Sequence, residues 1–283
     1  MIKRNKFKEK IFPPLALFCT FLGVILLLIF LVNILIDGLS RIDADFITSL
    51  PSRKAEKAGI LTAWTGSLWI MIMTALISIP IGVCAGIYME EYSKKSKINT
   101  LIEINIANLA GVPSIIYGLL GLEVFGRLLG LGNTILAGSF TLSLLILPII
   151  IVATRESIKA VPKSIKDASY ALGATKWETI TNHVLPYSVG GILTGVILSI
   201  SRAIGETAPL IAIGALAYVP FIAQSPFDEF TVLPIQIFNW TTRPQHAFLV
   251  NAAAAIIVLL LITFILNGIA VFLRNKWKMN LRY

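Results

Sequence analysis

Charged residues are scarce in this chain, and their scarcity excludes an ordinary soluble domain. Asp, Glu, Lys and Arg make up 14% of the 283 residues, whereas hydrophobic residues make up 56%. A soluble protein usually carries about 25% charged residues. The apolar runs are much longer than the strands of a membrane β-barrel and lack their alternation. The composition therefore predicts an all-α integral membrane protein.

Cysteine and histidine are nearly absent, which removes the usual ligands of a metal site. The two cysteines, Cys19 and Cys84, both lie in apolar runs, where cysteine behaves as a small hydrophobic residue. The two histidines, His183 and His246, fall on opposite sides of the membrane in the topology predicted below. We therefore expect neither a disulfide framework nor a metal site.

Motifs for catalysis are missing as well. The chain has no glycine-rich loop ending in Gly-Lys-Ser/Thr, so it is not itself an ATPase. It also has no His-Glu-x-x-His and no Gly-x-Ser-x-Gly, which leaves membrane protease and hydrolase functions without a motif. We therefore expect a non-catalytic protein with no cofactor of its own.

The chain does contain long apolar runs, each close to or above the roughly 20 residues that cross a bilayer. The first run is too long for a signal-peptide core, and no small-residue cleavage site follows it, so we expect it to be retained. The third run is interrupted by Gly111-Val112-Pro113-Ser114. The sequence predicts six spans, at about 13–36, 61–89, 101–125, 134–153, 185–219 and 247–273.

The basic residues cluster at the ends of these spans rather than on one face. Although the net charge of +9 could suggest nucleic acid, this clustering is typical of membrane topology. Lys and Arg are concentrated in both termini and in residues 90–97 and 154–183, whereas the alternate loops have few. The positive-inside rule therefore predicts that both termini are cytoplasmic, as an even number of spans requires, with membrane lipid rather than nucleic acid as the surroundings.

Four charged residues remain inside the predicted spans. Glu103 and Glu123 lie near opposite ends of the third span, where we expect their side chains to snorkel to the interface. Arg202 lies about 24 Å along a helix from Pro186, well inside the membrane. Glu206 follows four residues later, on the same helix face. Ionisable groups at this depth indicate a pathway for a polar solute; a structural ion pair that steadies helix packing is the alternative.

The chemistry of this pair suits an anion. A guanidinium stays charged and offers a planar fork of donors to oxyanion oxygens, and a neighbouring carboxylate keeps the anion from binding too tightly to leave. We therefore assign Arg202, Glu206 and the adjacent Thr207 to a substrate pathway.

Glycine and proline residues flank both this pathway and the interrupted third run. They predict helix breaks that face a water-lined cavity, with ordinary kinks as the alternative. The predicted breaks are at Gly111, Pro113, Gly205 and Pro209.

The longest basic loop, residues 155–186, predicts two short helices at an angle. Pro162 is typical of a first helical turn and Gly173 of a helix stop. Thr175 and Glu178 form the pattern of a capping box that begins the second helix. We expect Pro186 to end this helix just before the fifth span. Its predicted apolar face consists of Trp177, Ile180 and Val184.

This loop resembles the EAA loop of ABC-importer permeases. The family pattern is Glu-Ala-Ala, three residues, Gly, nine residues, then Ile, any residue, Leu and Pro. The chain has Asp167-Ala168-Ser169, Gly173 and His183-Val184-Leu185-Pro186 at the same spacing, with Asp167, Ser169 and His183 departing from the pattern. The resemblance implies that Asp167, Ala168, Ser169, Gly173, Leu185 and Pro186 couple the chain to an ATPase subunit.

A second set of motifs resembles the phosphate permeases of the PstA type. It comprises residues 202–210 (Arg-Ala-Ile-Gly-Glu-Thr-Ala-Pro-Leu), residues 111–118 (Gly-Val-Pro-Ser-Ile-Ile-Tyr-Gly) and residues 233–244, which include Asn239-Trp240 and Arg243-Pro244. The resemblance implies a type I ABC importer permease with the MetI-like fold. Its shared transmembrane domain would be 61–283, and 1–60 would be an added tail, first span and external loop.

The resemblance also implies an assembly in the cell membrane of a prokaryote. The expected partners are a homologous second permease (PstC-like), ATPase subunits that use ATP (PstB-like) and an extracytoplasmic phosphate-binding protein (PstS-like). The chain would form half of the translocation pathway. The alternatives are a permease for another oxyanion, sulfate or molybdate, a stand-alone secondary transporter or channel, and, least supported, a membrane enzyme.

Overall fold

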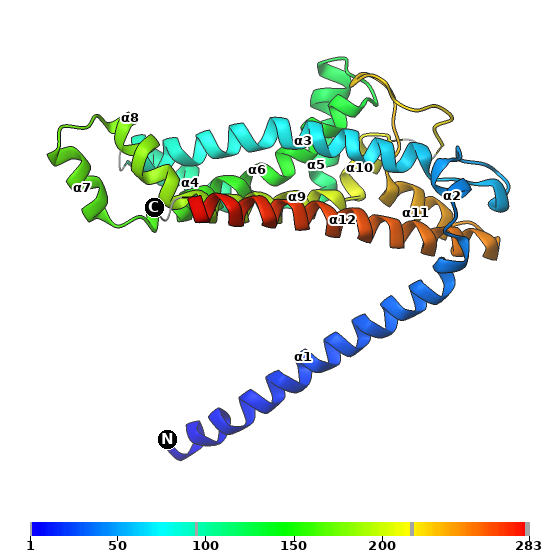
Figure 1. Ribbon diagram of the computed structural model, residues 1–283, viewed down its shortest axis with the longest axis horizontal. Helices are drawn as coiled ribbons and strands as arrows, with labels where there is room; N and C mark the ends of the chain where they lie inside the picture. The colour runs from blue at the N-terminus through cyan, green and yellow to red at the C-terminus, as the bar shows by residue number, and fades with distance from the viewer. Residues whose placement is uncertain (1, 94–95, 216–217, 281–283) are drawn as a thin grey trace.

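The computed structural model describes residues 2–93, 96–215 and 218–280, and regular structure in these residues is helical apart from one β-bridge between Thr134 and Glu229 (Figure 1). The basic residues at 94–95, part of the predicted fifth span at 216–217, and the last residues 281–283 lie outside the described part. Five helices in that part are long and apolar enough to cross a membrane. These are Ile11–Arg41, Leu61–Tyr92, Ile135–Lys159, Lys176–Ile204 and His246–Lys276.

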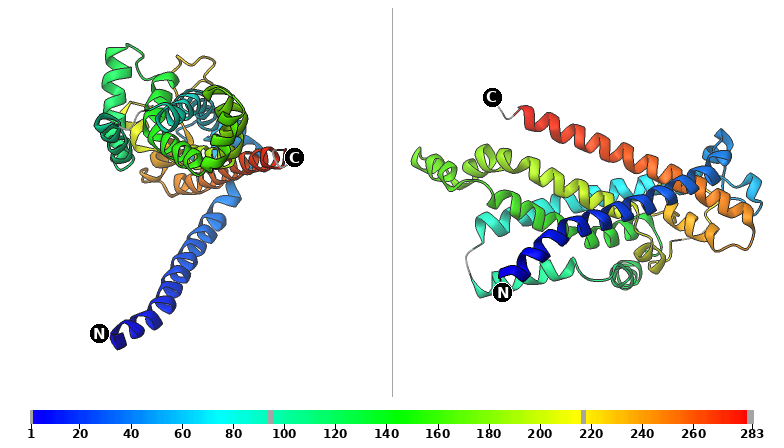
Figure 2. Two further views of the ribbon diagram at one scale, coloured as in Figure 1. Left: turned by 90° about the vertical axis from the view of Figure 1, so that its left-hand side faces the viewer. Right: turned by 90° about the horizontal axis from the view of Figure 1, so that it is seen from below.

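Four long helices form the bundle: α3 (Leu61–Ile87), α6 (Ile135–Lys159), α9 (Leu185–Ile204) and α12 (His246–Asn280). Seen end-on, α3, α6 and α9 lie around one another (Figure 2). Helix α6 is the most buried of the candidate spans. Its core side chains, among them Leu142, Leu145, Ile146 and Ile150, are almost completely buried.

Glycines allow the helices to approach α6 closely. A Cβ added at Gly195 of α9 would lie 2.2 Å from the Cβ of Ala153, and one at Gly191 would lie 2.3 Å from the Oγ of Ser157. This is the small-residue packing that membrane helices use, since lipid supplies no hydrophobic force between them.

Helix α1 (Ile2–Gly38) leaves the bundle, as Figure 1 and the left view of Figure 2 show. Its C-terminal end packs on the bundle: Ile34 contacts Ala253 and Ile257 of α12, and a Cβ added at Gly38 would lie 2.7 Å from the backbone of Ala253. The apolar side chains between residues 11 and 30 are exposed. This part of α1 therefore presents its whole circumference to lipid or to another subunit.

The third predicted span is not one straight helix. Helix α4 (Lys97–Leu109) ends at the Gly-Val-Pro-Ser interruption, and α5 (Ser114–Gly121) continues as the π-helical η4 (Leu122–Leu128) after a bend of 104°. The six-span count therefore requires this bent pair to act as one span. The bend has a local cause, because Pro113 has no N–H to donate and disfavours helical backbone in the residue before it.

The fifth predicted span, 185–219, is wrong at both ends. At its start, α8 (Lys176–Thr179) runs through the π-helical η5 (Ile180–Val184) directly into α9, so Pro186 does not end the second loop helix. The wide π turn lies just before Pro186, where the ring lacks an N–H and crowds the carbonyl one turn back. At the other end, α9 stops at Ile204, and a short helix, α10 (Ala208–Ala212), follows.

The opposite end of the molecule from α7 and α8 is built from short elements, as Figure 1 shows. They are η1 (Leu39–Arg41), α2 (Ala44–Thr48), η2 (Ala55–Lys57) and α11 (Leu233–Thr241). Their core is aromatic: the ring of Trp240 lies 6.0 Å from that of Phe46 and 6.4 Å from that of Phe248. This aromatic cluster joins α2, near the start of the chain, to α11 and α12, near its end.

Candidate functional site

The loop with the EAA-like pattern projects from one end of the bundle, the end at which α1 begins and α12 finishes (Figure 1). Helix α7 (Lys163–Ala171) begins directly after Pro162, and the chain turns at Gly173, whose φ is +86°. The predicted capping box is present: Thr175 N–H donates to Glu178 Oε2 at 2.7 Å, and Glu178 N–H donates to Thr175 Oγ1 at 3.3 Å.

Ser169 fixes the angle between the two loop helices. Its Oγ lies 2.9 Å from Thr179 Oγ1, and both side chains are buried. The family pattern has alanine at this position, so the hydroxyl that departs from the pattern makes the one side-chain hydrogen bond between α7 and α8 among the described residues. The sequence alone did not indicate this contact.

The loop exposes large apolar side chains. Leu172 is 90% exposed and Trp177 64% exposed. Of the three residues of the predicted apolar face, Ile180 and Val184 are completely buried, whereas Trp177 is exposed. Trp177 lies on α8 before the π turn, which changes the helical register, and in the part of the helix that projects beyond the bundle (Figure 1). The consequence is an apolar surface around the turn at Gly173.

Both loop helices bond to one residue at the end of α3, Glu91, in the π-helical η3 (Tyr88–Tyr92). The Lys166 ammonium of α7 pairs with the Glu91 carboxylate, whose side chain is only 7% exposed. The Lys176 ammonium of α8 donates to the Glu91 carbonyl oxygen and lies 4.7 Å from the centre of the Tyr92 ring. Sequence reasoning missed Glu91. The signal that could have found it is the pair of neighbouring carboxylates, Glu90 and Glu91, at the end of a span whose other charged residues are basic.

A second ion-pair cluster lies beside it. Arg155 Nη2 of α6 lies 2.9 Å from Glu103 Oε1 of α4 and 3.6 Å from Glu90 Oε2 of η3. Glu103, which was expected to snorkel to an interface, thus also has an ion-pair partner, Arg155, on a neighbouring helix. Glu123 instead pairs with Arg127 at 2.9 Å, and both side chains are largely exposed.

The predicted pathway residues lie in the middle of the molecule. Arg202 is in the last turn of α9, and its Nε donates to Glu206 Oε1 at 3.1 Å. Glu206 lies beyond the helix end, because Gly205 caps α9 with its N–H donating to the Arg202 carbonyl. The pair therefore forms at a helix C-terminus, where the dipole favours the cation. Thr207 follows, half-buried, as the first residue of the next helical turn.

The two glycine–proline interruptions come together in space. Helix α5, which follows the break at Gly111 and Pro113, packs on α10, which follows Gly205 and begins with Pro209 near its N-terminus. A Cβ added at Gly118 of α5 would lie 2.6 Å from Pro209 Cα. The hydroxyl of the buried Tyr117 donates to the Leu109 carbonyl at 2.6 Å and so spans the first break.

The Arg202 side chain is 39% exposed, and Glu206 is its only hydrogen-bonding partner among the described residues. Its two terminal nitrogens therefore remain available to an anion. No group of three or more histidine, cysteine, aspartate or glutamate side chains in the described ranges is arranged to hold a metal ion.

Comparison with known proteins adds relatives that match most of the chain. The chain is 34% identical over 245 residues to the probable ABC transporter permease protein YqgI of Bacillus subtilis, covering 82% of this chain and 83% of YqgI. It is 29% identical to the phosphate transport system permease protein PstA of Pasteurella multocida, covering 97% of both. It is 32% identical to PstA 1 of Mycobacterium tuberculosis, covering 76% of this chain and 70% of that protein.

Solved structures show the same fold at low sequence identity. A chain of a bacterial alginate ABC transporter, solved with an alginate-bound periplasmic protein, has a TM-score of 0.68 at 15% identity and covers 96% of this chain and 98% of its own. A chain of the inward-facing MetNI methionine ABC transporter has a TM-score of 0.61 at 16% identity, covering 75% of this chain and 94% of its own. The chain therefore has the MetI-like ABC importer permease fold.

The family of binding-protein-dependent transport system inner membrane components matches residues 82–279, from the last turns of α3 to the end of α12. This match covers both the projecting loop and the Arg202–Glu206 pair. The chain thus belongs to that family, as the non-catalytic, multi-pass permease subunit of an ABC importer.

Proposed function

We propose that this permease carries phosphate and that Arg202 and Glu206 form part of its pathway. The observation that carries the proposal is the partly exposed Arg202 guanidinium, held at 3.1 Å by a carboxylate that an incoming anion can replace. It lies where α9 ends, next to the packed interruptions of α5 and α10. Relatives named as phosphate transport system permease proteins support phosphate as the anion.

The projecting loop would couple this pathway to ATP hydrolysis in a partner. Leu172 and Trp177 offer apolar surface to a groove of an ATPase subunit (PstB-like), around the turn at Gly173. The pattern Asp167, Ala168, Ser169, Gly173, Leu185 and Pro186 would carry this role. Closure of the ATPase pair would move the loop and open the spans outward, and hydrolysis would reset them.

The remaining partners follow from the same proposal. A homologous second permease (PstC-like) would supply the other half of the pathway, and an extracytoplasmic phosphate-binding protein (PstS-like) would deliver the anion to the end formed by α2 and α11. Both termini and the loop would face the cytoplasm of a prokaryotic cell, in accordance with the positive-inside rule. Residues 1–60 would be an addition to a transmembrane domain of residues 61–283.

The test compares two arginines that have the same local pairing. Arg202→Gln removes the charge from the proposed pathway, whereas Arg127→Gln breaks the exposed Arg127–Glu123 pair, which has the same four-residue spacing. In the reconstituted importer we expect Arg202→Gln to lower phosphate uptake by about two orders of magnitude, as for loss of one charge-stabilising donor. We expect Arg127→Gln to leave uptake unchanged.

The double variant Arg202→Gln/Glu206→Gln separates a pathway role from a structural one. It removes both charges, so it should restore the amount of folded protein without restoring uptake. Normal phosphate uptake by this double variant would refute the pathway. Uptake of sulfate or molybdate in place of phosphate by the unmodified importer would instead favour another oxyanion, and transport without any ATPase would favour a secondary transporter.

A further inference from the structure

A basic hollow lies at the end of the molecule opposite the projecting loop. It has a volume of about 630 Å³ and is formed by three segments far apart in the sequence: the loop before η2, the segment after α10 and the turn after α11. The residues that line it are Pro51, Ser52, Arg53, Lys54, Tyr218 and Arg243.

The lining carries three cations and no carboxylate. In the described part of the chain, no ion pair engages Arg53 or Lys54, and both are exposed. Two contacts hold the Arg243 side chain in place. Its Nε donates to Asn239 Oδ1 at 3.2 Å, and its guanidinium lies 4.3 Å from the centre of the Phe248 ring. Its terminal nitrogens are left without a partner among the described residues.

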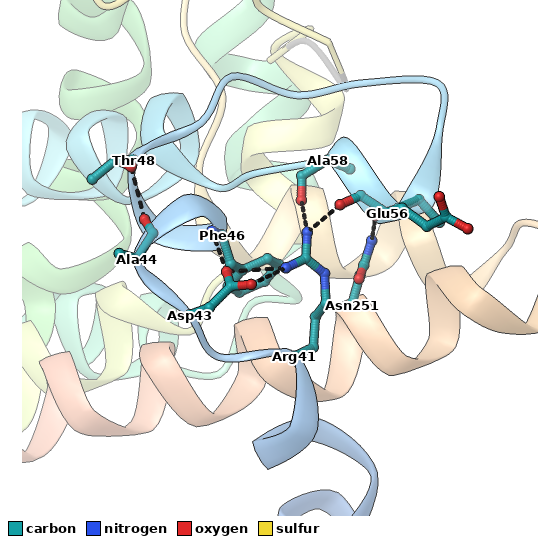
Figure 3. A network of polar contacts seen from close by, with 9 residues as sticks. Arg41, Asp43, Ala44, Phe46, Thr48, Glu56, Ala58 and Asn251 are labelled. Carbon is teal, nitrogen blue, oxygen red and sulfur yellow. Dashed lines mark hydrogen bonds and ion pairs between the residues drawn. The ribbon is translucent and has the colours of Figure 1, made fainter.

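The wall that presents Arg53 and Lys54 is held in place by a network around Arg41 (Figure 3). Arg41 Nη2 donates to the carbonyls of Glu56 at 2.8 Å and Ala58 at 3.3 Å, and its Nη1 pairs with Asp43 at 3.1 Å. Asn251 of α12 holds the same segment, its Nδ2 donating to the Ala55 carbonyl at 2.8 Å.

This network gives the hollow a fixed shape. Asp43 and backbone carbonyls engage both terminal nitrogens of Arg41, so these donors are directed into the wall rather than into the hollow. The Lys54 N–H donates to Ser52 Oγ at 3.2 Å, which fixes the turn that carries the two lining cations. Cations held on a fixed backbone lose little freedom when an anion binds, which raises affinity.

We propose that this hollow is a second anion site, which receives the transported oxyanion before it reaches Arg202. The proposal rests on the proposed function, under which the anion is phosphate. Guanidinium forks, an ammonium and the Tyr218 hydroxyl are donors suited to tetrahedral oxyanions. The volume is larger than that of one such ion, so the site also has room for water. Its effect is to concentrate anions at the mouth of the pathway.

The concave shape favours a small anion over an acidic protein surface. The donors come from three segments and line one concave space, which a small anion can enter and a folded protein surface cannot. Docking of an acidic patch on the binding protein is the competing use of the same charges, and the experiment distinguishes the two.

The test measures protection of a thiol placed in the hollow. Ser52→Cys is introduced into the assembled importer, with Cys19 and Cys84 changed to serine, and labelled with a membrane-impermeant thiol reagent at constant ionic strength. We expect inorganic phosphate to slow labelling in a concentration-dependent manner and chloride not to do so. Neutralising Arg53, Lys54 and Arg243 together to glutamine should abolish the protection.

Two further variants make the result interpretable. Arg53→Gln/Lys54→Gln leaves the Arg243 contacts intact and should still raise the phosphate concentration needed for protection by about tenfold. Lys57→Gln removes an exposed cation of the same segment that does not line the hollow, and it should change nothing.

The outcomes separate this inference from the proposed function. Phosphate uptake by the wild type without any phosphate protection would refute the hollow as an anion site and leave the proposed function standing. Protection by sulfate alone, without phosphate uptake, would refute phosphate as the substrate and support the hollow as an anion site. Unchanged protection in the glutamine variants, with a higher binding-protein concentration needed for ATP hydrolysis, would identify a docking patch and overturn the inference.

Discussion

Gly173 decides where the first loop helix ends, because its φ of +86° lies in the left-handed region. A Cβ at this position would meet no atom within 4 Å. The cost of substitution is therefore conformational, about 1–2 kcal/mol for an ordinary L-residue. Asparagine tolerates this backbone conformation much better than a β-branched residue does. The turn also places the exposed Leu172 in its position on the loop surface.

A comparison of Gly173→Val with Gly173→Asn isolates this backbone requirement. We expect Gly173→Val to insert normally but to reduce phosphate uptake and substrate-stimulated ATP hydrolysis together, because the turn and the apolar surface around it are displaced. Gly173→Asn should retain most of both activities. The measurement is uptake and hydrolysis in proteoliposomes at matched protein levels. Equal activities in the two variants would show that the left-handed turn is not needed for coupling.

At the level of single residues, the sequence predicts what depends on local chemistry. The stop at Gly173 and the Thr175–Glu178 capping box follow from neighbours within a few residues, and the structure has both. The partners of Glu103 and Glu91 come from helices far away in the sequence, α6 and α7, and hydropathy carries no information about such pairing. The sequence therefore shows where each charged residue lies along the chain, but it does not predict which residue pairs with it.

At the level of helices, the loop is tied to α3 by charge rather than by apolar packing alone. The Lys166–Glu91 pair joins α7 to η3 and is largely shielded from solvent, with the two side chains 19% and 7% exposed. Lys176 of α8 bonds to the Glu91 backbone, which a side-chain substitution leaves in place. Loss of the Glu91 carboxylate should therefore weaken the attachment of α7 but leave that of α8 in place.

Substitution of Glu91 by glutamine tests this attachment. It leaves the Lys166 ammonium partly buried without its counter-charge, a loss of about 3–5 kcal/mol when a buried pair is broken. We expect faster proteolysis between residues 160 and 175 and weaker coupling of ATP hydrolysis to uptake. Glu156→Gln, which breaks the exposed Glu156–Lys159 pair, is the matched control and should have neither effect. Unchanged protease sensitivity in Glu91→Gln would mean that α7 is held by other contacts.

The limits of helix prediction have a common cause. Hydropathy indicates how much apolar length a run has but not its direction, so the 104° bend between α4 and α5 could be placed at Pro113 while its size could not be predicted. The continuity of α8 with α9 through Pro186 depends on a π turn, an extra residue that no periodic pattern indicates. The exposure of Trp177 follows from that register change.

At the level of the whole molecule, the two ends differ in chemistry. One end carries α7, α8, the start of α1 and the finish of α12, and the other carries α2, α11 and the basic hollow (Figure 1). Six crossings, with the bent pair counted as one, would place both ends of the chain on one side, and the excess of Lys and Arg near α7 and α8 predicts that this side is cytoplasmic. The basic hollow would then face outward.

Two exposed positions test this orientation in intact cells. Gln224→Cys lies in the segment between α10 and α11, and Ser164→Cys lies in the first turn of α7; both side chains are exposed. With Cys19 and Cys84 changed to serine, we expect an impermeant thiol reagent to label Gln224→Cys in intact cells and Ser164→Cys only after the membrane is opened. The reverse pattern would invert the topology. It would also place the basic hollow on the side where a binding protein cannot deliver an anion, so the proposed direction of transport through Arg202 would fail with it.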